Sequence, residues 1–129
     1  MNEPKLPFSI GSRLRSFGYA LAGLGYFVRT EHNAWIHIAA TFAVLALAGV
    51  LGLDREEWLW VVLAIGWVWG AEAFNTAIER LADQVSLERN AAIGTVKDVA
   101  AAGVLISAIG ALIIGLLIFF PHVRSLVCG

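Results

Sequence analysis

The sequence has little charge and almost no cysteine. Only 15% of its 129 residues are Asp, Glu, Lys or Arg, whereas 59% are hydrophobic, and the mean hydropathy is +0.76. A water-soluble domain carries about 25% charged residues, so this composition indicates an integral membrane protein. The one cysteine, Cys128, has no partner within the chain, which excludes an intrachain disulfide framework and a cysteine-based metal site.

Basic clusters and glycine-rich nucleotide loops are also absent. The net charge is −1 and the nine Lys and Arg residues are dispersed, so we expect no nucleic acid partner. No G-x-x-x-x-G-K-[ST] or G-x-G-x-x-G motif occurs, so any ATP site would be built from helix ends and side chains. Without a cleavable leader pattern, an internal repeat or a linker, we expect residues 1–129 to form a single domain.

Three apolar segments are long enough to cross a bilayer. They occupy residues 34–53, 58–78 and 99–120, and a hydrocarbon layer of roughly 30 Å needs about 20 helical residues. Most of the dispersed Lys and Arg residues lie before the first segment or between the second and third. The positive-inside bias therefore predicts a cytoplasmic N-terminus and second connection, with residues 54–57 and the C-terminal tail outside. Pro121 is expected to end the third span.

Residues 12–30, ahead of the first span, have the spacing of an amphipathic helix. Apolar residues recur at intervals of three and four, and the arginines lie off this stripe, which consists of Leu14, Phe17, Leu21, Leu24 and Val28. The pattern predicts a helix on the cytoplasmic surface. The expected fold is all-α and integral to the membrane, with three transmembrane helices preceded by this surface helix.

The second span carries polar residues on its cytoplasmic half. At about 100° per residue, Glu72, Asn75, Glu79 and Asp83 fall on one helical face. Glu72 lies about 14 residues beyond Trp58, or roughly 20 Å into the span, where an ionisable group is unfavourable unless paired, protonated or hydrated. One such carboxylate is explained by a neighbouring helix that satisfies it, whereas four polar groups in one register favour a functional site.

Two more acidic residues are expected at the same level. Glu31 directly precedes the first span and Asp98 opens the third beside Lys97, so both would lie near Glu79 at one interface. Carboxylates, together with water and phosphate, are the ligands of Mg²⁺, and a lysine is a point charge for phosphate. Taken alone, Lys97 and Asp98 fit a plain interfacial ion pair. Only the whole set indicates a nucleotide site.

Two histidines lie near the start of the first span. His32 and His37 are five residues apart and do not share a helical face well. We interpret His37 as a packing histidine with satisfied polar atoms, not as a metal ligand.

These stretches resemble the prokaryotic diacylglycerol kinase and undecaprenol kinase family. The similarity runs from about Arg13 to Ile109 and is carried by the run from Glu72 to Asp83, by Lys97-Asp98, and by segments 16–23 and 31–37. The resemblance implies a homotrimer in the bacterial inner membrane, with active sites between subunits at the cytoplasmic interface. It further implies transfer of the γ-phosphate of ATP, with Mg²⁺, to the hydroxyl of a membrane lipid.

The resemblance also implies roles for individual residues. Glu72 would be the general base, with Asn75 orienting groups beside it, and Glu31 and Glu79 would hold the divalent metal. The residues implied in ATP binding are Tyr19, Glu31, Glu79, Asp83, Glu88, Lys97 and Asp98.

The substrate is predicted from a local pattern. Glu31, Asn33 and His37 resemble the undecaprenol kinase branch, so we expect undecaprenol to be favoured over diacylglycerol. The sequence departs from its relatives at residues 90–96, which lack a basic residue that they often carry, and at Ser12, where some have an arginine. Nucleotide affinity or selectivity is expected to differ accordingly, and Arg13 is adjacent to substitute for the missing arginine.

A small proton-coupled transporter or channel subunit is the alternative from another class, because intramembrane carboxylates also mark proton pathways. Such a protein needs acidic groups at midplane or on several spans. The first and third spans have none in their central regions. A purely structural subunit leaves Glu72 and Glu79 unexplained, so the sequence favours a lipid kinase.

Overall fold

The computed structural model describes residues 9–85 and 90–128, and every regular element in these ranges is an α-helix. The helices are α1 (Ile10–Thr30), α2 (His32–Leu51), α3 (Arg55–Val85) and α4 (Ala91–Cys128). Three of them, α2, α3 and α4, are long and apolar enough to cross a membrane. The predicted all-α class and the three predicted spans are therefore confirmed.

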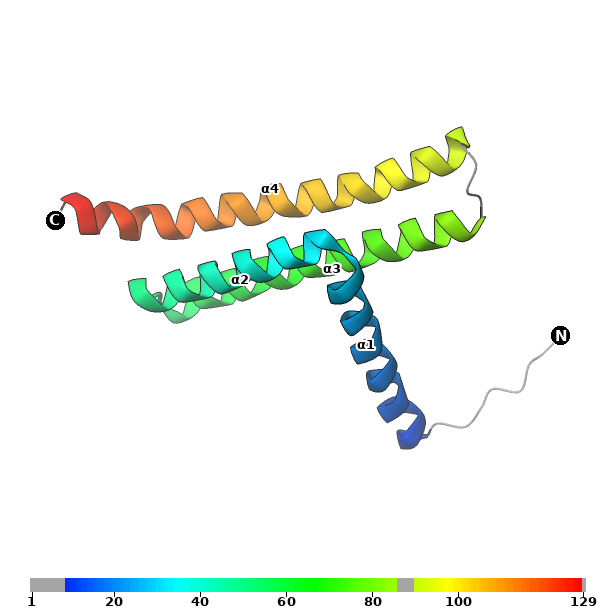
Figure 1. Cartoon of the computed structure of the whole chain (residues 1–129). Coiled ribbons are helices and arrows are strands. Elements are labelled where there is room, and N and C mark those ends of the chain that lie inside the picture. The colour runs from blue at the N-terminus through cyan, green and yellow to red at the C-terminus, as the bar shows by residue number, and fades with distance from the viewer. Residues whose placement is uncertain (1–8, 86–89, 129) are drawn as a thin grey trace.

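The three long helices lie side by side, and successive helices run in opposite directions (Figure 1). The most extensive packing is between α3 and α4, whereas α1 leaves the bundle at a steep angle. We call the end that carries Glu31, Glu79 and Asp83 the acidic end. The opposite end, which carries Asp54, Glu57 and His122, is the turn end.

Local backbone chemistry sets the helix boundaries. Glu31 is extended (φ −103°, ψ 120°), so it ends α1 and begins α2 with a sharp change of direction. Gly52 ends α2 in the left-handed region (φ 67°, ψ 47°), which a residue without a Cβ adopts without strain. Asp54 and Glu57 then accept hydrogen bonds from each other's backbone N–H, both at 2.9 Å, a capping box that starts α3.

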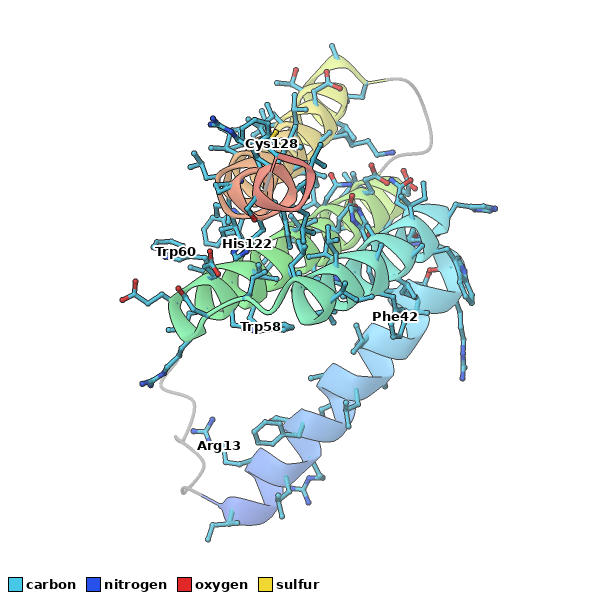
Figure 2. All side chains as sticks on the ribbon, turned by 90° about the vertical axis from the view of Figure 1, so that its left-hand side faces the viewer. Arg13, Phe42, Trp58, Trp60, His122 and Cys128 are labelled. Atoms are coloured by element: carbon cyan, nitrogen blue, oxygen red, sulfur yellow. The ribbon has the colours of Figure 1, made fainter. Side chains whose placement is uncertain are left out.

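Few side chains are buried within the chain. The main apolar cluster is near the turn end and consists of Ala48, Leu53, Val61 and Ile118. Large apolar side chains such as Phe42 and Trp60 point away from the bundle (Figure 2). Outward-facing apolar side chains are what a helix in lipid requires, because hydrocarbon rather than water is the surrounding solvent.

The helix ends differ in detail from the predicted ones. The surface helix begins at Ile10 instead of residue 12, and the first membrane helix covers residues 32–51 instead of 34–53. The other two extend beyond 58–78 and 99–120. At about 1.5 Å per residue, the 38 residues of α4 measure roughly 57 Å, nearly twice the hydrocarbon layer, so its ends project beyond it.

The prediction that Pro121 ends the third membrane helix is wrong. The helix continues through Pro121 to Cys128. A proline removes one backbone hydrogen bond and crowds the preceding turn, but contacts of the following residues offset that loss. His122 Nε2 lies 2.8 Å from Glu57 Oε1, and Ser125 Oγ donates to the His122 carbonyl at 2.7 Å. Figure 2 shows His122 between α4 and α3.

Candidate active site

Three interhelical contacts fix the register of α3 against the chain that precedes it. From the middle of the bundle toward the acidic end, they are Trp69 Nε1 to Thr41 Oγ1 at 3.0 Å, His37 Nε2 to Glu72 Oε1 at 2.8 Å, and Arg80 Nη2 to Glu31 Oε1 at 2.7 Å. From Trp69 to Arg80 along α3, the partner residue falls from Thr41 to Glu31, as antiparallel packing requires. This register brings His37 to Glu72.

Glu72 is the buried carboxyl group of the site. The residue is 5% exposed, and its only hydrogen bond among the described residues is the one between Oε1 and His37. A carboxylate accepts but cannot donate, so the His37 Nε2–H donates when Glu72 is ionised. The second oxygen, Oε2, has no protein partner within residues 9–85 and 90–128. A buried group with one oxygen held and one open is suited to accept a proton from a ligand.

Asn75 lies one turn further along α3, on the same face. Its Nδ2 donates to Glu79 Oε1 at 3.4 Å, and its Oδ1 is buried without a hydrogen-bond partner. An unpaired buried carbonyl destabilises a fold by about 1–3 kcal/mol unless something binds it. The amide is therefore placed to accept a hydrogen bond from a ligand beside Glu72, as its predicted orienting role requires.

Four charged residues at the acidic end form two ion pairs. Arg80 contacts Glu31 and lies 5.7 Å from the centre of the Tyr26 ring, and Lys97 Nζ donates to Asp83 Oδ1 at 2.6 Å. These residues lie outside the apolar stretches 58–78 and 99–120. The hydrogen bond that Lys97 donates to Asp83 raises the pKa of the Lys97 ammonium above its ordinary value. Both cations thus stand at the acidic end in charged form.

The predicted metal ligands are not gathered into a ready cluster. Glu31 is engaged by Arg80 and Glu79 by Asn75. In the described part of the chain, no group of three or more His, Cys, Asp or Glu side chains has a metal-binding arrangement. A Mg²⁺ ion that arrives with phosphates usually takes only one or two carboxylates, so this donor set still fits a nucleotide-bound metal.

The remaining predicted site residues are more scattered. Asp98 is exposed and is not the partner of Lys97, which binds Asp83. Tyr19 is 73% exposed and lies about 18 Å along α1 from Glu31, so the chain does not bring it to the other residues. Glu88 lies outside the described residues.

The sequence did not identify the partner of His37. It predicted a packing histidine with satisfied polar atoms, and in the structure the ring nitrogen contacts the buried Glu72. The His37 side chain is 21% exposed and its ring tilts against that of Trp69, with centroids 6.5 Å apart. His37 therefore belongs to the site.

Two largely apolar grooves run along the bundle from this region. One, of about 660 Å³, lies between α3 and α4 and includes Asn75. The other, of about 580 Å³, lies among α2, α3 and α4 and includes His37. Apolar surface is thus continuous with the polar site, an arrangement that suits a ligand with a polar head and an apolar chain.

The fold and the site define a small integral membrane protein whose polar residues gather at one end of three membrane-spanning helices. The prokaryotic diacylglycerol kinase family matches residues 18–119, and the chain belongs to this family. The predicted family is therefore confirmed.

Two relatives agree with the family assignment. The undecaprenol kinase of Bacillus subtilis is 38% identical over 107 residues, which cover 83% of this chain and 87% of that protein. The diacylglycerol kinase of Synechocystis sp. is 35% identical over 114 residues, which cover 88% of this chain and 65% of that protein. The chain is a prokaryotic lipid kinase, as predicted, and the transporter alternative has no support. Membership of a kinase family implies ATP-dependent phosphoryl transfer to a lipid alcohol.

Proposed function

We propose that this lipid kinase phosphorylates undecaprenol in preference to diacylglycerol, with Glu72 as its general base. The observation that carries the proposal is the state of Glu72, which is buried, held through Oε1 by His37, and open at Oε2. A base within the membrane helices can reach the hydroxyl of a lipid, whereas a base in water would meet soluble alcohols first.

The reaction follows from this arrangement. Oε2 of Glu72 accepts the proton of the lipid hydroxyl, and the lipid oxygen forms a bond to the γ-phosphorus of ATP. The bond between that phosphorus and the bridging oxygen of the β-phosphate breaks, so ADP leaves and the lipid phosphate remains. Asn75 orients groups beside Glu72 through its unpaired Oδ1. The apolar grooves give the lipid chain a surface to lie on.

The nucleotide is proposed to bind at the acidic end. Lys97, Asp98 and Asp83 contact it. The resemblance to the family also implies Tyr19 and Glu88 in ATP binding, of which Tyr19 is not brought to the other residues within one chain. The Lys97–Asp83 and Arg80–Glu31 pairs are substantially exposed, and exposed pairs contribute little because water and salt compete with them. Phosphate oxygens can therefore replace a carboxylate on Lys97 without disturbing the fold.

The metal proposed for this reaction is Mg²⁺, with Glu31 and Glu79 as its protein ligands. Both side chains are partly exposed at the acidic end, where a metal bound to ATP can reach them. When bound, the ion neutralises charge on the transferred phosphoryl group.

We further propose that residues 1–129 form one kinase domain in the bacterial inner membrane, with the acidic end cytoplasmic. The distribution of Lys and Arg supports this orientation. α1 is proposed to lie on the membrane surface, because apolar side chains such as Leu14, Phe17 and Leu21 are about two-thirds exposed on it. The resemblance to the family supports a homotrimer with active sites between subunits.

The choice of undecaprenol has two supports. The relative with the larger matched share of its length, 87% at 38% identity, is named an undecaprenol kinase. The pattern of Glu31, Asn33 and His37 resembles the same branch, and two of these residues form interhelical contacts at the site.

The test is phosphate transfer from labelled ATP and Mg²⁺ to undecaprenol and to diacylglycerol, each presented separately in detergent micelles to the purified protein. We expect labelled undecaprenyl phosphate in clear excess. A preference for diacylglycerol would keep the mechanism and overturn the substrate, and absence of product from both lipids would overturn the proposed function.

A further inference from the structure

His37 contacts the glutamate on which the proposed reaction depends. Its Nε2 is 2.8 Å from Glu72 Oε1, and it comes from a different helix, α2. We infer that His37 is a positioning residue for phosphoryl transfer, which holds Oε1 of Glu72 and so presents Oε2 to the lipid hydroxyl. This inference rests on the proposed role of Glu72 as the general base.

A glutamate side chain needs such a partner at this position. It has three rotatable bonds, and the Glu72 side chain is only 6% exposed, so little water is available to hold its oxygens. His37 supplies its one hydrogen bond among the described residues. Without that donor, the carboxylate would be buried without a hydrogen-bond partner and free to turn. The contact therefore fixes which oxygen faces the substrate.

His37 is itself held in place by its neighbours. The Trp69 indole N–H donates a hydrogen bond to Thr41, which lies one turn from His37 on α2. The indole ring also lies beside the His37 imidazole, at an interplanar angle of 58°. The edge of the Trp69 ring meets Phe27 of α1, with centroids 5.9 Å apart. Three helices thus fix the imidazole before the substrate arrives, and such preorganisation is what positioning residues contribute to a rate.

The proton balance requires no proton to leave His37. Before transfer, Nε2–H donates to Oε1 of the carboxylate. The lipid proton then passes to Oε2, and Oε1 becomes the carbonyl oxygen of the acid, which still accepts the same hydrogen bond. After the product leaves, the proton on Oε2 returns to solvent. The imidazole keeps the same hydrogen throughout.

Other titratable groups near the site are engaged elsewhere. Within residues 9–85 and 90–128, only His37 hydrogen-bonds to Glu72. The charged residues of the neighbouring elements have other partners, namely Glu31 with Arg80, Glu79 with Asn75, and Lys97 with Asp83. Asp98 of α4 is exposed. A loss of kcat on removal of the His37 donor therefore reports on the contact with Glu72.

The experiment compares two variants of the full chain in micelles. His37→Leu removes the donor at similar volume, and His37→Gln keeps an N–H donor. We expect His37→Leu to lower kcat about 10- to 100-fold, with KM for ATP and lipid changed less than about twofold. His37→Gln should recover most of the rate.

The chain offers a matched control. His122 also lies 2.8 Å from a glutamate, but at the turn end. His122→Leu makes the same chemical change and should leave kcat unchanged. Equal losses of kcat in His37→Leu and His122→Leu would overturn the inference, because the effect would then follow from general destabilisation.

A double variant separates this inference from the proposed function. If His37 acts through Glu72, adding His37→Leu to Glu72→Gln causes no further loss. Full activity of Glu72→Gln would overturn the proposed base itself. An inactive Glu72→Gln beside a His37→Leu variant with wild-type kcat would overturn only the positioning role. If His37→Leu does not fold, the test uses His37→Gln, which keeps the donor. A folded His37→Gln variant that loses more than about tenfold in kcat would overturn the positioning role of His37.

Discussion

The two ends of the bundle each contain a histidine 2.8 Å from a glutamate, and the two pairs differ in what surrounds them. At the turn end, both oxygens of Glu57 lie within 3.0 Å of His122, and one also accepts the Asp54 backbone N–H. At the acidic end, Glu72 is more deeply buried and has only one oxygen engaged. A carboxylate with both oxygens engaged fastens helices, whereas one with an open oxygen is available for chemistry.

The surroundings explain the difference. Glu57 sits in the first turn of α3, where unpaired backbone N–H groups favour an acidic side chain. Glu72 sits fifteen residues later in the middle of the same helix, where the backbone groups are already paired. A carboxyl group in the middle of a helix is not stabilised by the unpaired N–H groups of the helix end. Its presence there is explained by a partner on another helix or by a role in a reaction.

The largest expected effect is the loss of phosphoryl transfer in the Glu72→Gln variant. Loss of a general base lowers transfer by about 10²- to 10⁴-fold, while ATP binding and folding persist. The matched control, Glu57→Gln, makes the same change at the turn end and should keep the rate within about threefold, since Glu57 lies fifteen residues, or roughly 22 Å along α3, from Glu72. Single-turnover transfer from labelled ATP measures both. Near-normal turnover by Glu72→Gln, or a comparable loss in Glu57→Gln, would break the distinction between the two ends.

A smaller effect is expected from Glu79→Gln. If Glu79 holds Mg²⁺, the concentration of Mg²⁺ that gives half-maximal activity should rise by about tenfold or more. Glu56→Gln is the control, because Glu56 is an exposed acid at the turn end. Titration of activity with Mg²⁺ at fixed ATP measures the shift. An unchanged Mg²⁺ requirement in Glu79→Gln would remove it from the metal site.

Most of the acidic end could be predicted from the sequence because helical periodicity is local. One face of α3 carries Glu72, Asn75 and Glu79, as helical spacing predicts, and Asn75 donates a hydrogen bond to Glu79. The contact between His37 and Glu72 was missed because His37 was compared only with residues of its own segment, namely Glu31, His32 and Asn33. Counting outward from the turn at residues 52–54 puts His37 and Glu72 at similar heights on antiparallel helices. That comparison across the hairpin was the available signal.

Other features depend on contacts that sequence spacing does not contain. Pro121 was expected to end a helix, but the contact of His122 with Glu57, sixty-five residues earlier, holds the segment that follows it. Lys97 was paired in sequence with Asp98, yet it reaches across to Asp83 on α3. Tyr19 stands apart because Glu31 redirects the chain between α1 and α2. The first two outcomes were decided by contacts between helices, and the third by the backbone conformation of one residue.

The smallest effect is expected at the turn end, from His122→Leu. The side chains of His122 and Glu57 are 29% and 26% exposed, so water partly replaces the lost hydrogen bond and the free energy of unfolding should fall by only about 1 kcal/mol. The loss should be local, because Pro121 has already removed one backbone hydrogen bond and the residues after it depend on this contact. Hydrogen exchange in micelles should therefore quicken in residues 122–128 while α3 near Glu72 stays protected. Equal loss of protection at both ends would mean that His122 supports the whole bundle, and the separation of a fastening end from a reacting end would fail.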